Sequence, residues 1–150
     1  MFNIIVDTRE QNPFDFRIIK PQPQIIVATL QTGDYSIKGL EDRITIERKS
    51  LSDAYSTFGR GRARFERELE RMAEFQFAAV VIEADWKTII KYPPHRSKVT
   101  PKHVYRSVIA WQQRYRVHFW ACYSRAFAEK TTFVLLERFW IDTTGKQKRV

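Results

Sequence analysis

Cysteine and long apolar runs are what this sequence of 150 residues lacks most clearly. Cys122 is the single cysteine, which makes an intramolecular disulfide impossible and excludes a zinc site made of cysteines. No apolar run reaches the ~20 residues that a membrane span needs, and the first residues lack the basic start and apolar stretch of a secretory signal. We therefore expect a protein of a reducing compartment without a membrane partner.

Acidic residues are scarce relative to basic ones. The chain has 26 Lys and Arg against 17 Asp and Glu, a formal net charge of +9 and a pI near 9.9. This excess indicates a polyanionic partner, and nucleic acid is the first candidate. A hydrophobic content of 43% with 14% aromatics supplies one core, so we predict a single domain that folds alone or as a small oligomer.

Apolar patterning predicts an α/β fold with a parallel or mixed sheet. Strands are expected at residues 4–6, 25–28, 35–38, 44–49, 77–82 and 117–121, and the nearly all-apolar run 77–82 is typical of a strand buried on both faces. Helices are expected after Lys49, over 63–75, from 101, and from 124 to about 139, with Ser50, Thr100 and Ser124 as capping residues.

The most informative stretch is a predicted hairpin. Alternation along its second arm places Glu47 and Lys49 on one face, with α-carbons about 6.6 Å apart, and Arg48 on the other. Asp34, at the start of the first arm, can lie beside them. Two carboxylates and a lysine would then converge, and hard oxygen ligands of this kind suit Mg²⁺ or Mn²⁺. The same charges also fit an exposed hairpin whose side chains are solvated.

Charged residues flank this hairpin on both sides in the sequence. Asp7 ends the first expected strand at its carboxyl edge, where α/β sheets usually place their chemistry, and Arg9 and Glu10 follow it. These three residues also fit an exposed turn. Asp53 lies in the first turn of the helix after Lys49, where a carboxylate either serves the site or interacts with the helix dipole.

A basic loop comes next. Arg60 and Arg62 lie in a loop with two glycines, and Arg64 follows it, so we expect all three to contact backbone phosphates. The spacing also pairs Arg64 with Glu68 and Glu68 with Arg71, which is typical of a solvated helix face.

The ordered motifs resemble a known family. Gly33-Asp34-Tyr35, a hairpin, then Glu47-Arg48-Lys49 and Asp53 are similar to the GD…ERKxxxD signature of XPF-type structure-selective endonucleases, a branch of the PD-(D/E)xK nuclease superfamily. Residues 6–10 resemble the first-strand motif of that family, and Gly61-Arg62 the GR pair that follows its signature. The resemblance covers roughly residues 4 to 140.

The resemblance implies a restriction-endonuclease-like fold, in which helices flank a mixed central sheet. It implies a metal-dependent endonuclease that hydrolyses DNA phosphodiester bonds at branched, flapped or junction DNA in repair, recombination or replication. Asp34, Glu47 and Asp7 are then expected to bind Mg²⁺ or Mn²⁺. Lys49 is expected as the catalytic lysine, with Arg48 and Asp53 supporting the site. Arg9 is expected to bind DNA together with the arginines of the basic loop.

A non-catalytic DNA-binding partner subunit is the alternative, because the family contains partners whose nuclease motif has decayed. The intact Asp34, Glu47 and Lys49 argue against it. Family members commonly carry a helicase domain or a helix-hairpin-helix module, and neither fits here, so we expect such a module in another chain. We assign residues 1–143 to the nuclease domain and 144–150 to a basic tail. The expected location is the cytoplasm of a prokaryote or a phage-infected cell, or the nucleus of a eukaryote.

A homodimer built from the C-terminal third is also expected from the resemblance. Many large aromatic side chains lie between Trp111 and Trp140, more than two helices and a strand easily hide. In the last helix we expect the core face to be Phe127, Val134 and Leu135. Phe133 and Trp140 then lie off that face, where a second copy could cover them.

Overall fold

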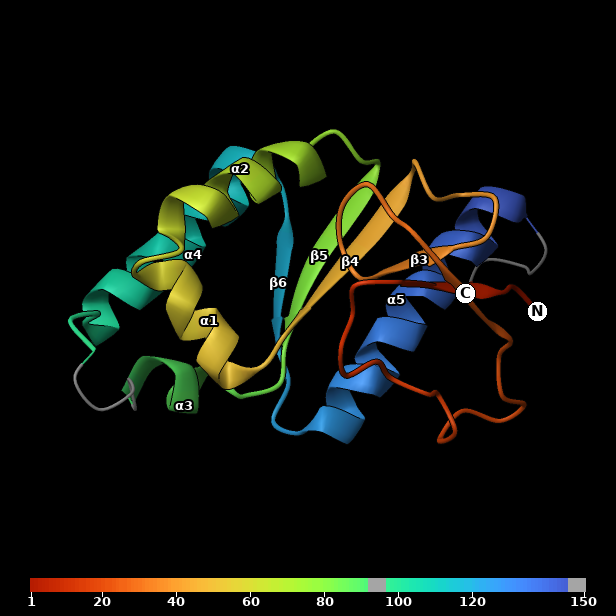
Figure 1. Cartoon of the computed structure of the whole chain (residues 1–150), viewed down its shortest axis with the longest axis horizontal. Helices are drawn as coiled ribbons and strands as arrows, with labels where there is room; N and C mark the ends of the chain where they lie inside the picture. The colour runs from red at the N-terminus through yellow and green to blue at the C-terminus, as the bar shows by residue number, and fades with distance from the viewer. Residues whose placement is uncertain (92–96, 146–150) are drawn as a thin grey trace.

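The computed structural model describes residues 1–91 and 97–145, and its centre is a six-stranded mixed sheet (Figure 1). The strands are β1 (Ile4–Asp7), β2 (Ile25–Ala28), β3 (Tyr35–Ile37), β4 (Ile44–Lys49), β5 (Phe77–Ile82) and β6 (His118–Ala121), in the order β2-β1-β3-β4-β5-β6. Strand β3 is antiparallel to β1 and β4, whereas the pairs β1–β2, β4–β5 and β5–β6 are parallel. The predicted α/β class, mixed sheet and hairpin are confirmed.

Five helices are described: α1 (Leu51–Phe58), α2 (Arg62–Met72), α3 (Trp86–Lys91), α4 (Pro101–Tyr115) and α5 (Arg125–Thr144). Ser50, Thr100 and Ser124 cap α1, α4 and α5 as predicted, because each hydroxyl accepts a hydrogen bond from the backbone three residues on. Helix α3 was not predicted. Helix α5 runs to Thr144, the first residue of the proposed tail, and residues 146–150 lie outside the described part. No helix in the described ranges is long and apolar enough to cross a membrane.

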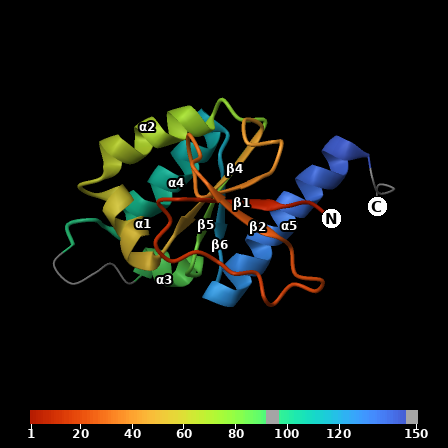
Figure 2. The same cartoon turned by 45° about the vertical axis from the view of Figure 1, so that its right-hand side comes forward.

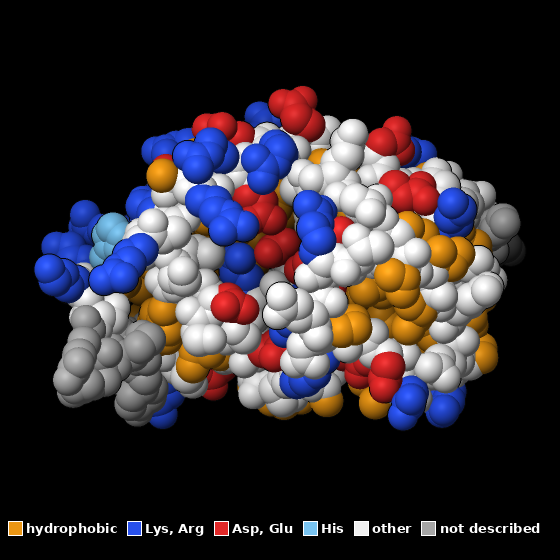
Figure 3. Space-filling view, in the orientation of Figure 1, with side chains coloured by type: hydrophobic (Ala, Val, Ile, Leu, Met, Phe, Trp, Pro, Cys, Tyr) orange, Lys and Arg blue, Asp and Glu red, His pale blue; other side chains and the backbone are white. Residues whose placement is uncertain are grey.

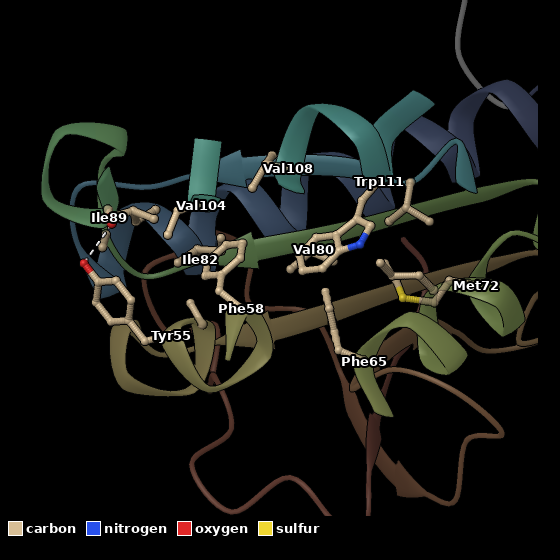
Figure 4. Close-up of a cluster of buried hydrophobic side chains, with 14 of the residues drawn as sticks. Tyr55, Phe58, Phe65, Met72, Val80, Ile82, Ile89, Val104, Val108 and Trp111 are labelled. Carbon is tan, nitrogen blue, oxygen red and sulfur yellow. Dashed lines mark hydrogen bonds between the residues drawn. The ribbon is translucent and has the colours of Figure 1, made fainter. Parts of the chain in front are cut away.

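One core fills the space between the sheet and helices α1, α2 and α4 (Figure 4). Trp111 of α4 is fully buried there and stacks on Phe58, with ring centres 5.4 Å apart. Val104 and Val108 lie on the same helix face, as their spacing predicted. This core fixes α1 and α2 against the sheet, and these two helices form one wall of the site described below.

The second core lies on the opposite face of the sheet, under α5 (Figure 2). The expected core face of α5 is wrong for two of its three residues: Phe127 and Val134 are 37% and 47% exposed, whereas Leu135 packs against the core as predicted. Phe133, expected off that face, is only 8% exposed, and Trp140 also packs against this core. The side chains that face the sheet are Ala128, Thr132, Phe133 and Leu136. Small residues at 128 and 132 let the helix approach the sheet closely. Because α5 has apolar residues on nearly every side, spacing alone did not identify this face.

Candidate active site

The site is built where the start of β3 meets the end of β4. Gly33 has a positive φ of 81°, and a Cβ there would collide with Oγ1 of Thr45, so only glycine fits. The next residue, Asp34, donates its backbone N–H to Ile46 (2.9 Å) and accepts one from Asp7 (2.8 Å). These two bonds hold Asp34 between β1 and β4.

The predicted trio of Asp34, Glu47 and Lys49 is brought together. One carboxylate oxygen of Asp34 accepts the backbone N–H of Arg48 at 2.8 Å. The Lys49 ammonium lies 3.2 Å from Oε1 of Glu47 and 4.6 Å from the ring centre of Phe65 on α2. Lys49 is only 9% exposed, so the reading of a solvated hairpin is wrong.

The two carboxyl groups are close enough to perturb each other. Burial raises the pKa of Asp34 to about 6, against the lowering effect of the Arg48 N–H. Burial also raises the pKa of Glu47 well above its usual value, and the Asp34 charge adds to this, whereas the Lys49 charge opposes it. A pair of crowded, partly buried carboxylates of this kind favours a proton or a cation between them.

The trio lies in a polar trough with two adjoining parts. The first part, of about 440 Å³, also contacts Gln31, Arg64, Glu68 and Arg71, and the second, of about 420 Å³, contacts Gln11, Asn12 and Ser50. Both parts share five residues: Arg9, Asp34, Glu47, Lys49 and Asp53. Figure 3 shows this arrangement as acidic side chains in a hollow with Lys and Arg at its rim.

Comparisons with known proteins identify the family and the fold. The model of the ERCC4 domain family matches residues 6–134. The chain belongs to the ERCC4 domain family. Its fold is that of XPF-type nucleases: XPF from Aeropyrum pernix and the same protein in complex with DNA superpose with TM-scores of 0.70 and 0.69, each at 23% identity. The alignments cover 96% and 100% of this chain but only 66% and 68% of those chains. No curated protein matches the sequence.

Arg48 of this ERCC4 domain points to the face opposite Glu47, as predicted. Its guanidinium lies 2.9 Å from Glu10 and 2.9 Å from Glu83, and all three side chains are largely buried. Arg125 of α5 reaches the same Glu83 oxygen at 2.7 Å. This network ties β4, β5, α5 and the loop after β1 together behind the site, so Arg48 has a supporting role.

Asp7 is buried, and its carboxylate forms hydrogen bonds within the chain. It accepts hydrogen bonds from the Arg9 guanidinium at 2.8 Å and from the Leu30 backbone N–H at 3.3 Å. Burial alone would raise the Asp7 pKa, but the hydrogen bonds from Arg9 and Leu30 hold it below its usual value. In the structure Asp7 therefore orients Arg9, whose side chain is 66% exposed at the rim of the trough. A metal-ligand role for Asp7 stays a prediction.

The other predicted site residues are distributed differently. Asp53 is exposed and lines both parts of the trough, while its backbone N–H is capped by Ser50. Arg64 lines the first part, whereas Arg60 is exposed and does not line the trough. Arg62 turns toward α4 and does not line the trough.

Three residues of the site were not found from the sequence. Glu68 lines the trough beside Glu47 and raises its pKa, both through its charge and through a side-chain hydrogen bond. Neither predicted ion pair of Glu68 is present among those recorded in the described ranges. Arg71 lines the trough instead, and Phe65, expected only as a core residue, also contacts Lys49. Periodicity signals a helix face, but it does not show what the face meets.

The donor set fits a hard divalent cation. Asp34 and Glu47 offer adjacent carboxylate oxygens whose mutual repulsion a cation would relieve. Within residues 1–91 and 97–145, no group of three His, Cys, Asp or Glu residues could hold a metal ion as placed. Two protein carboxylates leave most coordination positions for water and substrate oxygens, as is usual for Mg²⁺.

Proposed function

We propose that this chain is a divalent-metal-dependent DNA endonuclease that cuts branched, flapped or junction DNA. The observation that carries the proposal is the partly buried pair of Asp34 and Glu47, with the Lys49 ammonium 3.2 Å from Glu47, in a trough rimmed by arginines. The ERCC4 domain match and the similarity to an XPF structure in complex with DNA support it.

Each side chain has a distinct task in this reaction. Asp34 and Glu47 would hold Mg²⁺ or Mn²⁺, which stabilises charge on the phosphate and lowers the pKa of a bound water. Lys49, positioned by Glu47 and the Phe65 ring, donates a hydrogen bond to the attacking water or to the developing negative charge. Arg9 lies at the rim, where it can contact a neighbouring phosphate.

The two parts of the trough share Arg9, Asp34, Glu47, Lys49 and Asp53 and differ in the rest of their lining. Arg64 and Arg71 line the first part, and Asn12 lines the second. We propose that a DNA strand runs along both parts past the shared residues, with Arg64 and Arg71 contacting its phosphates, so that cleavage is internal.

A panel of labelled DNA structures tests this proposal. The purified chain is incubated with flaps, three-way and four-way junctions, splayed arms and plain duplex, in Mg²⁺, in Mn²⁺ and in EDTA. We expect cleavage near a branch point only in the presence of a metal. Binding of branched DNA without cleavage in either metal would instead favour the non-catalytic partner subunit.

We further propose that the chain forms a homodimer through a surface beside the sheet edge at β6. The exposed apolar residues of this edge surface are Trp120, Tyr123, Phe127 and Val134, with exposed fractions of 45%, 70%, 37% and 47%. Phe127 and Val134 are seven residues apart and share one side of α5, and Tyr123 stacks on Phe127 at 4.7 Å. The proposed contact thus moves away from Phe133, which is buried in the chain's own core.

We infer that a further module contributes to substrate choice. The chain covers about two thirds of the XPF structures that it resembles. We propose that a helicase or helix-hairpin-helix module in a partner chain brings it to branched DNA.

A further inference from the structure

A second basic hollow lies outside the trough, at the start of α4. It has a volume of about 450 Å³ and is lined by Arg62, Thr100, Lys102, His103, Arg106, Ser107 and Ala110. Among the residues that the structure describes, no acidic one lines it. Figure 3 shows Lys and Arg side chains gathered around a histidine at this end of the molecule. We call it the α4 hollow.

Two cations of the α4 hollow are available to a ligand. Lys102 and Arg106 are exposed and four residues apart, so both project from one side of α4. In the described part of the chain, neither belongs to a recorded ion pair. Within the described ranges, no acidic side chain therefore competes with an incoming anion for either of them.

The floor of the α4 hollow is fixed by a third cation. The Arg62 guanidinium donates to Ser107 (2.7 Å), pairs with Glu66 (3.1 Å) and lies 4.8 Å from the ring centre of the buried Trp111. Nε2 of His103 lies 3.1 Å from the carbonyl oxygen of Phe58. These contacts anchor the start of α4 to α1 and α2, so the exposed cations are held in a defined place.

The α4 hollow adjoins the trough across one turn of α2. Arg62 lines the hollow, whereas Gly61 and Arg64, on either side of it in sequence, line the trough. A helix with its side chains is about 10 Å across, which corresponds to about three nucleotides at a rise of about 3.4 Å. A strand or duplex arm that leaves the trough over α2 therefore reaches the α4 hollow after a few nucleotides.

We propose that the α4 hollow binds a backbone phosphate of the DNA arm that extends beyond the trough, with Lys102 and Arg106 as the phosphate ligands. The inference rests on the proposed nuclease function, because it needs DNA in the trough. Its ligand class is a phosphodiester within a nucleic acid chain. Contacts of this kind set the register of the DNA and carry no base sequence information.

The test compares DNA of two lengths. Binding is measured in EDTA, so that cleavage plays no part, with a duplex of about 20 base pairs and with a hairpin fragment whose loop closes a stem of about 4 base pairs, enough to fill only the trough. For Lys102→Ala/Arg106→Ala we expect roughly 10-fold weaker binding of the long duplex and a salt slope lower by about one to two. Binding of the short fragment should change by less than twofold.

A matched control removes two exposed lysines elsewhere, Lys20→Ala/Lys38→Ala, which lowers the net charge equally. The control variant should weaken binding of both DNA lengths to the same small extent, much less than Lys102→Ala/Arg106→Ala weakens binding of the long duplex. Two results for Lys102→Ala/Arg106→Ala would overturn the inference: an equal loss of affinity for both DNA lengths, or no loss of affinity for the long duplex. The second result would point to an acidic protein as the ligand of the α4 hollow. Because the assay needs no cleavage, failure of the nuclease proposal would show separately, as DNA binding without metal-dependent cutting.

Discussion

At the residue scale, the carboxyl group of Asp34 destabilises the metal-free fold at neutral pH. Its pKa is about 6 in the folded chain against an ordinary value of 3.8. The folded state therefore binds this proton more tightly than the unfolded state does. This tighter binding of the proton raises the free energy of unfolding by its full amount below about pH 4, and the contribution is lost as the pH rises through about 6.

Asp34→Asn should accordingly stabilise the metal-free protein. At pH 7.5 in EDTA we expect a free energy of unfolding higher than that of the wild type by on the order of 1 to 3 kcal/mol, with the difference vanishing near pH 4. The amide oxygen can still accept the Arg48 N–H. Urea titration at several pH values measures this, and Asp42→Asn, at an exposed position, is the neutral control. A variant equally destabilised at every pH would refute the assigned shift.

Glu68 allows a second test at this scale, on metal affinity. Its carboxyl lies against Glu47, so its charge strengthens the field that a cation experiences. Glu68→Gln should weaken Mn²⁺ binding about 10-fold, as changes beside metal ligands often do. Isothermal titration calorimetry without DNA gives the affinity directly. Glu70→Gln, at an exposed position of the same helix, should leave it unchanged, and equal affinities for both variants would remove Glu68 from the site.

At the element scale, the hairpin depends on one glycine. Gly33→Ala places a methyl group against Thr45 in a backbone conformation that disfavours it, so β3 and β4 cannot keep their register. We expect a loss of several kcal/mol of stability and of metal binding together.

Gly39→Ala is the matched control, because Gly39 has a similar positive φ of 86° but open space around it. It should cost only about 1 kcal/mol. Thermal unfolding of both variants decides the point, and similar melting temperatures would show that the contact with Thr45 is unimportant.

Much of this element-scale picture follows from the sequence. The alternation along residues 44–49 correctly separated Glu47 and Lys49 from Arg48, because a strand has a fixed period of two. Helix α5 was harder, because its apolar residues surround the axis and the sheet selects the face that packs best. The position of Glu68 could not be predicted either, since contact between α2 and β4 is a tertiary property that helical spacing does not encode.

At the scale of the whole molecule, the edge surface predicts self-association. A stable dimer interface buries about 800 Å² of surface on each partner. The four exposed apolar residues of the edge surface would form the centre of such an interface. Val134→Glu should convert the dimer to a monomer of 17.9 kDa in light scattering at micromolar concentration. Ile109→Glu, at an exposed position of α4, should leave the dimer intact. A wild-type mass near 17.9 kDa would contradict the proposal.

The most direct test of the nuclease site compares DNA cleavage by two variants that carry the same substitution. On the branched DNA that the wild type cuts in Mg²⁺, Glu47→Gln should lower the cleavage rate at least about 100-fold while DNA binding changes by less than about twofold. Glu70→Gln should cut like the wild type. Cleavage by Glu47→Gln at the wild-type rate would contradict the assignment of Asp34, Glu47 and Lys49 as the catalytic centre.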